Sequence, residues 1–170
     1  MSDEARPAAP AEPHGVLGLA AGLLATVGGL LILGVAALVT ASIVRRWSGA
    51  QPIPGDFELV QMATAISVFA FLPYCQLRRG NIAVDTFTAW LPERVNRAVD
   101  ALWDMVYSAT MLLLAWCLFN GTRDMIQNGT TTMVAGIAMW PAIALCTVLA
   151  AGVALTACIT SMSLLIGRRA

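Results

Sequence analysis

Few residues in this chain could carry chemistry, and they are dispersed. The 170-residue sequence has one histidine, His14, and all ten basic residues are arginine, so a lysine Schiff base and a phosphate-loop lysine are excluded. One histidine is too few for a bis-histidine haem, a three-histidine zinc site or an HExxH motif. Residue counts alone therefore exclude these kinds of metal and haem chemistry.

Two other groups are candidates for reactivity. Asp100 and Asp104 are four residues apart and share a helix face, but acid–base catalysis would need water and a substrate cleft, and nothing in the sequence indicates either. The cysteines have no CxxC spacing, so we expect small core residues rather than metal ligands. They are Cys75, Cys117, Cys146 and Cys158. We therefore expect no enzyme activity, no bound metal and no cofactor.

The elements that must position these residues are apolar. The chain is 58% hydrophobic and 12% charged, with a mean hydropathy of +0.75, and its charged fraction is about half that of an ordinary soluble domain. Its formal net charge of zero offers nucleic acid no basic field. We therefore expect lipid, not water, to surround most of the chain.

Four stretches are long enough to cross a bilayer, which takes about 20 apolar residues. They are expected near residues 16–44, 57–78, 94–119 and 140–166. A cleaved signal peptide is the alternative for the first stretch, but that stretch is about twice the length of a usual signal-peptide core. The sequence thus predicts an all-α membrane protein, with a disordered tail at 1–14 and one four-helix domain at 15–167.

The arginines indicate how the helices are oriented, because cytoplasmic loops are richer in Lys and Arg. With both termini in the cytoplasm, Arg6, Arg78, Arg79, Arg94, Arg97, Arg168 and Arg169 are inside, and Arg45, Arg46 and Arg123 are outside. This asymmetry favours cytoplasmic termini. Residues expected to anchor the helices at the lipid interface are Arg78, Arg79, Trp90, Arg94, Arg97, Trp103, Trp47 and Trp140.

The connection between the second and third spans mixes apolar and small polar residues over 80–92. After Pro92, apolar residues recur at helical spacing from Val95 to Leu102. We expect an interfacial amphipathic helix near 80–92, or an extension of the third helix below the bilayer; a solvated loop is the alternative.

Small residues form a stripe on the first helix, at Gly18, Gly22, Ala25 and Gly29. Such a stripe lets another helix backbone approach closely, although the sequence leaves open whether that helix is in this chain. In the second helix, Asp56 and Glu58 fall in the first turn, where the helix dipole favours carboxylates.

The segment 120–139 is expected to lie outside the membrane. Asn-Gly-Thr occurs at 120–122 and at 128–130, and turn formation is the preferred interpretation over glycosylation. Three threonines at 130–132 predict a hairpin-like excursion, which could dock an extracytoplasmic partner.

The second helix and its flanks resemble a known family. Gly55-Asp56-Phe57-Glu58-Leu59 begins it, Phe71-Leu72-Pro73-Tyr74 lies within it, and Arg79-Gly80-Asn81-Ile82-Ala83-Val84-Asp85 follows it. This pattern resembles the DctQ-like small membrane subunit of tripartite ATP-independent periplasmic (TRAP) transporters. Asn81 stands where that family usually has histidine, and Ala138 in Gly136-Ile137-Ala138-Met139-Trp140 stands where a proline is common.

The resemblance implies a multi-pass subunit of the bacterial inner membrane that works with a large multispanning subunit and a periplasmic substrate-binding protein. It also implies sodium-coupled uptake of an organic acid, with sodium and substrate bound by the large subunit. On this interpretation Glu58 and Asp85 buttress the helix ends, and membrane lipids contact the helices. The alternative is a self-sufficient small homo-oligomeric transporter, although the spans lack the buried acidic residue such a protein usually needs.

Overall fold

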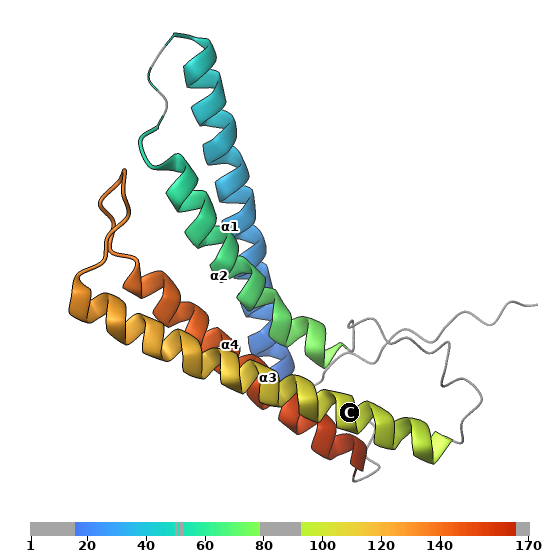
Figure 1. Ribbon diagram of the computed structural model, residues 1–170. Helices are drawn as coiled ribbons and strands as arrows, with labels where there is room; N and C mark the ends of the chain where they lie inside the picture. Colours follow the sequence, from blue (N-terminus) through green and yellow to red (C-terminus); the bar gives the residue numbers. More distant parts are fainter. Residues whose placement is uncertain (1–15, 50, 52, 79–92, 166–170) are drawn as a thin grey trace, which may run out of the picture.

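Four apolar helices make up the part of the chain that the structure describes, which covers residues 16–49, 51, 53–78 and 93–165 of this computed structural model (Figure 1). They are α1 (Val16–Trp47), α2 (Asp56–Leu77), α3 (Glu93–Asn128) and α4 (Trp140–Leu165). Each is long and apolar enough to span a membrane. The prediction of an all-α protein with four spans is therefore confirmed.

Two helices continue past their predicted ends. α1 reaches Trp47 instead of residue 44, and α3 reaches Asn128 instead of residue 119. The turn predicted at 120–122 is therefore wrong. In α3 the Asn120 side chain donates to the Trp116 carbonyl at 3.0 Å, and Thr122 Oγ donates to the Leu118 carbonyl at 2.8 Å. These bonds to the preceding turn let turn-forming residues remain helical.

The interfacial segment predicted near 80–92 lies outside the described residues. The same is true of Arg79, Gly80, Asn81, Asp85 and Trp90. α3 begins at Glu93, whereas its apolar part begins at Ala98. The apolar pattern that follows Pro92 therefore belongs to an extension of the third helix, which is one of the two expected structures.

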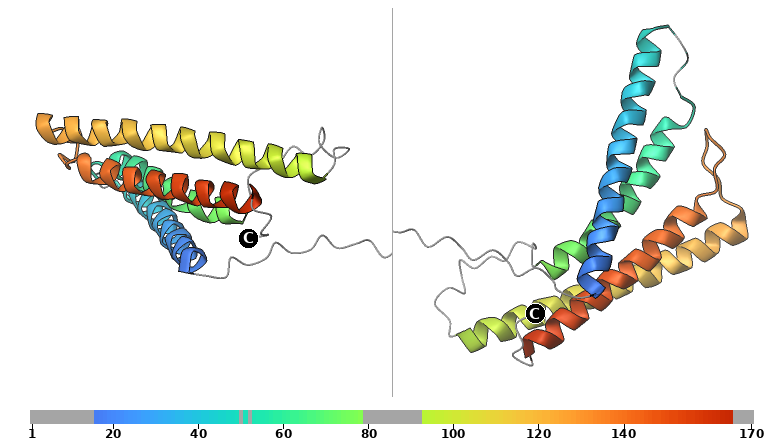
Figure 2. Two further views of the ribbon diagram at one scale, coloured as in Figure 1. Left: turned by 90° about the horizontal axis from the view of Figure 1, so that it is seen from below. Right: turned by 180° about the vertical axis from the view of Figure 1, so that it is seen from behind.

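The helices form two antiparallel hairpins, α1 with α2 and α3 with α4, and the hairpins meet where α2 packs on α4. α4, which contacts both α2 and α3, carries small buried side chains: Ala150, Val153 and Ala157 are completely buried. The hairpins spread apart toward the end where α1 and α3 finish, and the loop between α3 and α4 reaches across toward α2 (Figures 1 and 2).

Helix length fits a tilted or protruding arrangement. α1 has 32 residues and α3 has 36, which at 1.5 Å per residue gives about 48 and 54 Å. The hydrocarbon core of a bilayer is about 30 Å thick. Helices of this length must tilt or extend beyond the lipid, and the spread of the two hairpins is consistent with opposite tilts.

The α1–α2 contact tests the glycine stripe predicted on α1. A Cβ added at Gly28 would lie 3.1 Å from the Ala70 Cβ, while one added at Gly29 would meet nothing within 4 Å. The face of α1 that contacts α2 therefore runs through Gly28, and not through Gly29 as the predicted stripe has it. Gly22 lies on that face, where a Cβ would be 4.0 Å from the Tyr74 ring. Gly18 and Ala25 are half-buried. Of the predicted stripe, Gly22 is therefore the position seen against α2.

Adjacent glycines on α1 give a matched test of this packing. Gly28→Leu should lower the free energy of unfolding by roughly 1–3 kcal/mol, because the side chain has no room beside Ala70 and Phe71. Gly29→Leu should be near neutral or slightly stabilising, because leucine favours helix and a Cβ at this position meets nothing within 4 Å. Unfolding in mixed micelles measures both. Equal losses at the two positions would contradict the packing described here.

Candidate functional site

The two hairpins are joined at the end of the molecule where α1 and α3 finish and α2 and α4 begin, which we call the clamp end. Residues Thr130–Met139 form a tight hairpin there, with a single bridge between Thr131 and Ala138. The Thr132 amide donates to the Ile137 carbonyl at 2.9 Å. The hairpin-like excursion predicted from the three threonines is thus confirmed.

Glu58, in the first turn of α2, binds this hairpin through both carboxylate oxygens. Its Oε1 accepts the Val134 amide at 2.8 Å and its Oε2 accepts the Ala135 amide at 2.9 Å. Hydrogen bonds to an ionised acceptor are shorter and stronger than neutral ones, and two parallel bonds also fix orientation. Glu58 therefore links α2 to Val134 and Ala135, which lie 76 and 77 positions further along the chain. The sequence predicted only that its position at a helix start is favourable.

Gly55 brings the same two segments into direct contact. It precedes α2 in a left-handed conformation, with φ of 76°, and is buried. A Cβ at this position would lie 2.5 Å from the Cβ of Ala135, closer than carbon atoms approach. Glycine is required twice over, because both its backbone conformation and the nearness of Ala135 exclude a side chain.

Asp56 connects the clamp end to α1. Its Oδ2 accepts a short hydrogen bond from the Ser42 hydroxyl, and its Oδ1 accepts the Phe57 amide at 2.7 Å. Ser42 is buried on α1. Three residues at the start of α2, Gly55, Asp56 and Glu58, therefore hold α1, α2 and the 130–139 hairpin together.

A second junction lies near the opposite end of the helices. Gln76 is only 2% exposed, and its Nε2 donates to Asp104 Oδ1 at 2.9 Å, which links α2 to α3. Ser161 of α4 donates to the Ala101 carbonyl of α3 at 2.9 Å. Asp104 is thus held by Gln76, whereas Asp100, one turn earlier on α3, is exposed.

The Gln76–Asp104 contact gives a prediction about stability. Gln76→Leu should destabilise the protein by about 1–3 kcal/mol, because the charged acceptor loses its bond inside the bundle. Adding Asp104→Leu should recover part of that loss. With two leucines in place of Gln76 and Asp104, no carboxylate is left inside the bundle without a hydrogen-bond donor. A double-mutant cycle of unfolding free energies measures the coupling, and strictly additive losses would show that the contact contributes nothing.

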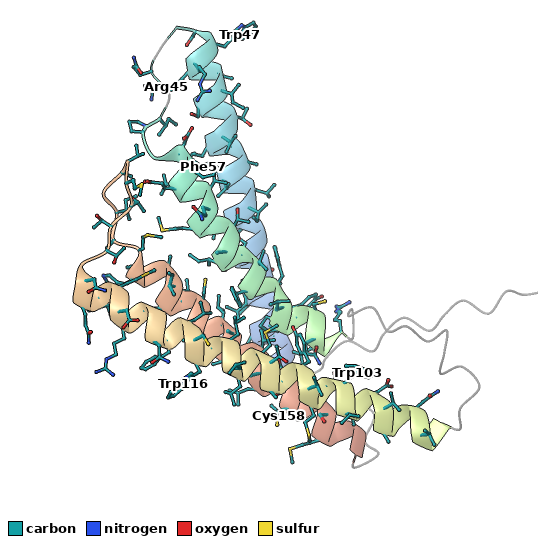
Figure 3. The ribbon with its side chains drawn as sticks, in the orientation of Figure 1. Arg45, Trp47, Phe57, Trp103, Trp116 and Cys158 are labelled. Atoms are coloured by element: carbon teal, nitrogen blue, oxygen red, sulfur yellow. The ribbon has the colours of Figure 1, made fainter. Side chains whose placement is uncertain are left out.

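Most of the residues predicted to contact the lipid interface are exposed where the structure describes them. Trp47, Trp103 and Trp140 have exposed rings, and Figure 3 shows Trp47 at the end of α1. The Arg78 guanidinium lies 5.0 Å from the centre of the Tyr74 ring, an arrangement favourable for a cation and a π system. Arg94 and Arg97 fall within α3.

The cysteines do not form the uniform core set that was expected. Cys146 is buried and Cys75 is half-buried, but Cys117 and Cys158 are exposed. Figure 3 shows Cys158 on the outer side of the α3–α4 hairpin. The expectation was wrong for these two because a membrane helix is apolar on its outer face as well, so an apolar residue type does not indicate burial. Within the described segments no three His, Cys, Asp or Glu side chains are grouped to hold a metal.

Gly55 and Glu58 stand out in the sequence, but their contacts do not. Ser42, Val134 and Ala135 have no special chemistry, and two of them contribute only backbone amides or a methyl group. A glycine followed by two carboxylates at a helix start was the available signal. This signal indicated that the start of α2 has a specific role, but it did not indicate which segment the start of α2 contacts.

Comparison with known proteins gives a family match. The model of a family described as "Tripartite ATP-independent periplasmic transporters, DctQ component" matches residues 35–166. That stretch includes all of α2, α3 and the 130–139 hairpin, and therefore the residues of both junctions. No curated protein and no solved structure matches the chain.

Proposed function

The chain belongs to the DctQ family, the small membrane components of TRAP transporters, and we propose that in such a transporter it is a static scaffold for the large multispanning subunit. DctQ is a family of transporter components and not of enzymes. On this proposal the complete system takes up an organic acid with sodium across a bacterial inner membrane. The sodium and substrate sites belong to the large subunit, and the small subunit holds that subunit in place.

The position of the charged residues carries this proposal. No charged residue lies between Leu59 and Leu77, between Met105 and Thr122, or anywhere in α4. Transport sites usually need charged or broken helices near the middle of the membrane. The carboxylates that bond to other segments do so instead at the two ends of α2: Asp56 and Glu58 lie in its first turn, and Asp104 of α3 binds Gln76 in its last turn.

Exposed apolar faces supply surface for a partner and for lipid. Within the described bundle α3 packs mainly on α4, with the Gln76–Asp104 bond as its link to α2, and it presents large side chains outward. These include Leu102, Trp103, Leu112, Leu113, Trp116 and Phe119. A partner subunit and lipid tails can both cover such a face. The two hydrogen-bonded junctions support a rigid scaffold, because each ties one hairpin to the other.

Docking of the periplasmic binding protein is proposed for the charged outer rim. Arg45 and Arg46 end α1, Arg123 and Asp124 lie in the last turns of α3, and all four are exposed. With both termini in the cytoplasm, this rim faces the periplasm. Contacts between exposed charges favour fast encounter and weaken with salt, so we expect association to slow as ionic strength rises.

Anchoring by arginine is tested by replacing Arg78, Arg79, Arg94 and Arg97 together with glutamine. We expect a reduced yield of the membrane complex, because the replaced side chains no longer pair with lipid headgroups. Replacement of Arg45 and Arg46, near the opposite end of the helices, is the matched control for loss of charge. Quantitative purification from membranes measures the yield, and an unchanged yield would remove the anchoring argument.

Co-purification tests the proposed role. The chain, tagged and expressed with its large multispanning partner, should be recovered as a stable complex, and the partner should be poorly recovered without it. A larger partner that is stable and fully active alone would contradict the scaffold role. A pure homo-oligomer of this chain that moves substrate would favour the alternative of a self-sufficient transporter.

A further inference from the structure

An exposed apolar patch lies at the clamp end, and neither the junctions nor the charged rim explain it. It consists of Phe57, which is 76% exposed, Met133, which is 100% exposed, and Val134, which is 66% exposed. Phe57 belongs to α2 and the other two to the 130–139 hairpin. Because Glu58, next to Phe57, binds the Val134 amide, the tip of the hairpin lies against the start of α2. We call these three residues the hairpin patch.

We infer that the hairpin patch rests on the lipid bilayer, in its interfacial layer, and fixes the depth of the clamp end. The first support is composition. From Asn128 to Met139 the chain has no charged residue, although a loop outside a membrane normally carries some. An uncharged loop with apolar side chains at its tip is suited to the boundary between headgroups and acyl chains.

Position gives the second support. The patch lies between the starts of two membrane-spanning helices, because Phe57 is the second residue of α2 and the hairpin leads into α4 at Trp140. Figure 3 shows Phe57 at the start of α2, beside the tip of the hairpin. Trp140 has a partly exposed ring, and tryptophan is enriched at membrane interfaces. The patch is therefore continuous with surfaces that already face lipid.

The contacts between α2 and the 130–139 hairpin hold the hairpin patch in a fixed position. Two hydrogen bonds to Glu58 and the close approach of Gly55 to Ala135 fix the hairpin before it meets lipid. A preorganised apolar surface loses little conformational entropy when it is buried. The charged rim, by contrast, is suited to water and to a protein partner. The clamp end therefore has a lipid-facing part and a water-facing part.

This inference needs only a chain that spans a bilayer, and it does not depend on the proposed role in transport. Loss of the lipid contact would leave co-purification with the large subunit unaffected. Failure of co-purification would likewise leave the lipid contact in place. The two claims can therefore fail separately.

Site-specific fluorescence tests the inference. An environment-sensitive dye is attached at Met133→Cys, in a full-length chain whose four cysteines are replaced by alanine, and the protein is placed in phosphatidylcholine–phosphatidylglycerol nanodiscs. Gln127→Cys, on the exposed last turn of α3, is the matched control. Quenching by lipid with a shallow nitroxide should be several-fold stronger at 133 than at 127, and iodide in the water should quench 127 more strongly.

Equal quenching at the two positions, or stronger iodide quenching at 133, would overturn the inference. A dye at 133 that is protected only after a periplasmic binding protein is added would assign the patch to protein docking instead. Lipid quenching that disappears when the large subunit is present would assign it to that subunit.

Hydroxyl-radical footprinting needs no substitution and covers the case in which the cysteine-free chain does not fold. In nanodiscs, Met133 should be oxidised as slowly as Met105, an exposed residue within a span. Oxidation of Met133 many times faster than that of Met105 would show that water surrounds the hairpin tip, and would reject the lipid contact.

Discussion

Replacing Gly55 with alanine is expected to lower the free energy of unfolding by roughly 2–5 kcal/mol, the largest effect of any single substitution considered. A side chain in the left-handed region costs about 1–2 kcal/mol, and forcing a methyl group into a filled space costs about 1–3 kcal/mol more. Both apply here, because φ is 76° and the new Cβ would lie 2.5 Å from that of Ala135. Unfolding in mixed micelles measures the loss.

Gly49→Ala separates the two causes. Gly49 has a similar φ of 80°, but a Cβ there meets nothing within 4 Å, so this variant should show only the conformational cost of about 1–2 kcal/mol. Combining Gly55→Ala with Ala135→Gly should restore the part that is due to the clash. If Gly55→Ala and Gly49→Ala lower the free energy of unfolding by the same amount, Ala135 does not pack against Gly55. The contact between the hairpin and the start of α2 would then be wrong.

Replacing Glu58 with glutamine should free the 130–139 hairpin while leaving the helices intact. Glutamine has nearly the same shape, but it offers one acceptor oxygen and an NH₂ donor in place of two acceptors. Its NH₂ group would oppose the amide of Val134 or Ala135, which the carboxylate now binds. We expect amide exchange at these two residues to rise by roughly tenfold, as expected when a charge-assisted hydrogen bond is lost.

Asp124→Asn provides the control for this substitution. It removes one carboxylate from an exposed position on α3, so it should leave exchange in the hairpin unchanged. Hydrogen exchange followed by mass spectrometry resolves the hairpin from the flanking helices. A Glu58→Gln protein with a fully protected hairpin would show that the hairpin is held by something other than the carboxylate.

Much of the fold could be predicted from sequence because membranes impose a simple rule. A run of about 20 apolar residues must be helical to satisfy its backbone hydrogen bonds in lipid, and the four spans followed from this. The end of α3 could not be found in the same way. Apart from Met125 and Ile126, residues 120–128 are polar or glycine. In water the polar side chains can end a helix or, as Asn120 and Thr122 do here, bond to the preceding turn.

Contacts between the helices were harder to predict than the positions of the helices in the sequence. On α1, Gly28 and Gly29 are both small and apolar, and only the direction of α2 decides which of them is at the contact. At the clamp end, the partners of Glu58 are backbone amides of Val134 and Ala135. Every residue except proline has a backbone N–H group, so residue type gave no signal. A family pattern pointed to Gly55 and Glu58, while their physical reason needed three-dimensional structure.

The central claim is that this DctQ chain stabilises a transporter and does not itself move substrate. Reconstitution into liposomes tests it most directly, with an imposed sodium gradient, the periplasmic binding protein and labelled organic acid. We predict uptake when this chain and the large subunit are both present, and none when this chain is the only membrane component. Sodium-driven uptake by liposomes that contain this chain without the large subunit would contradict the account.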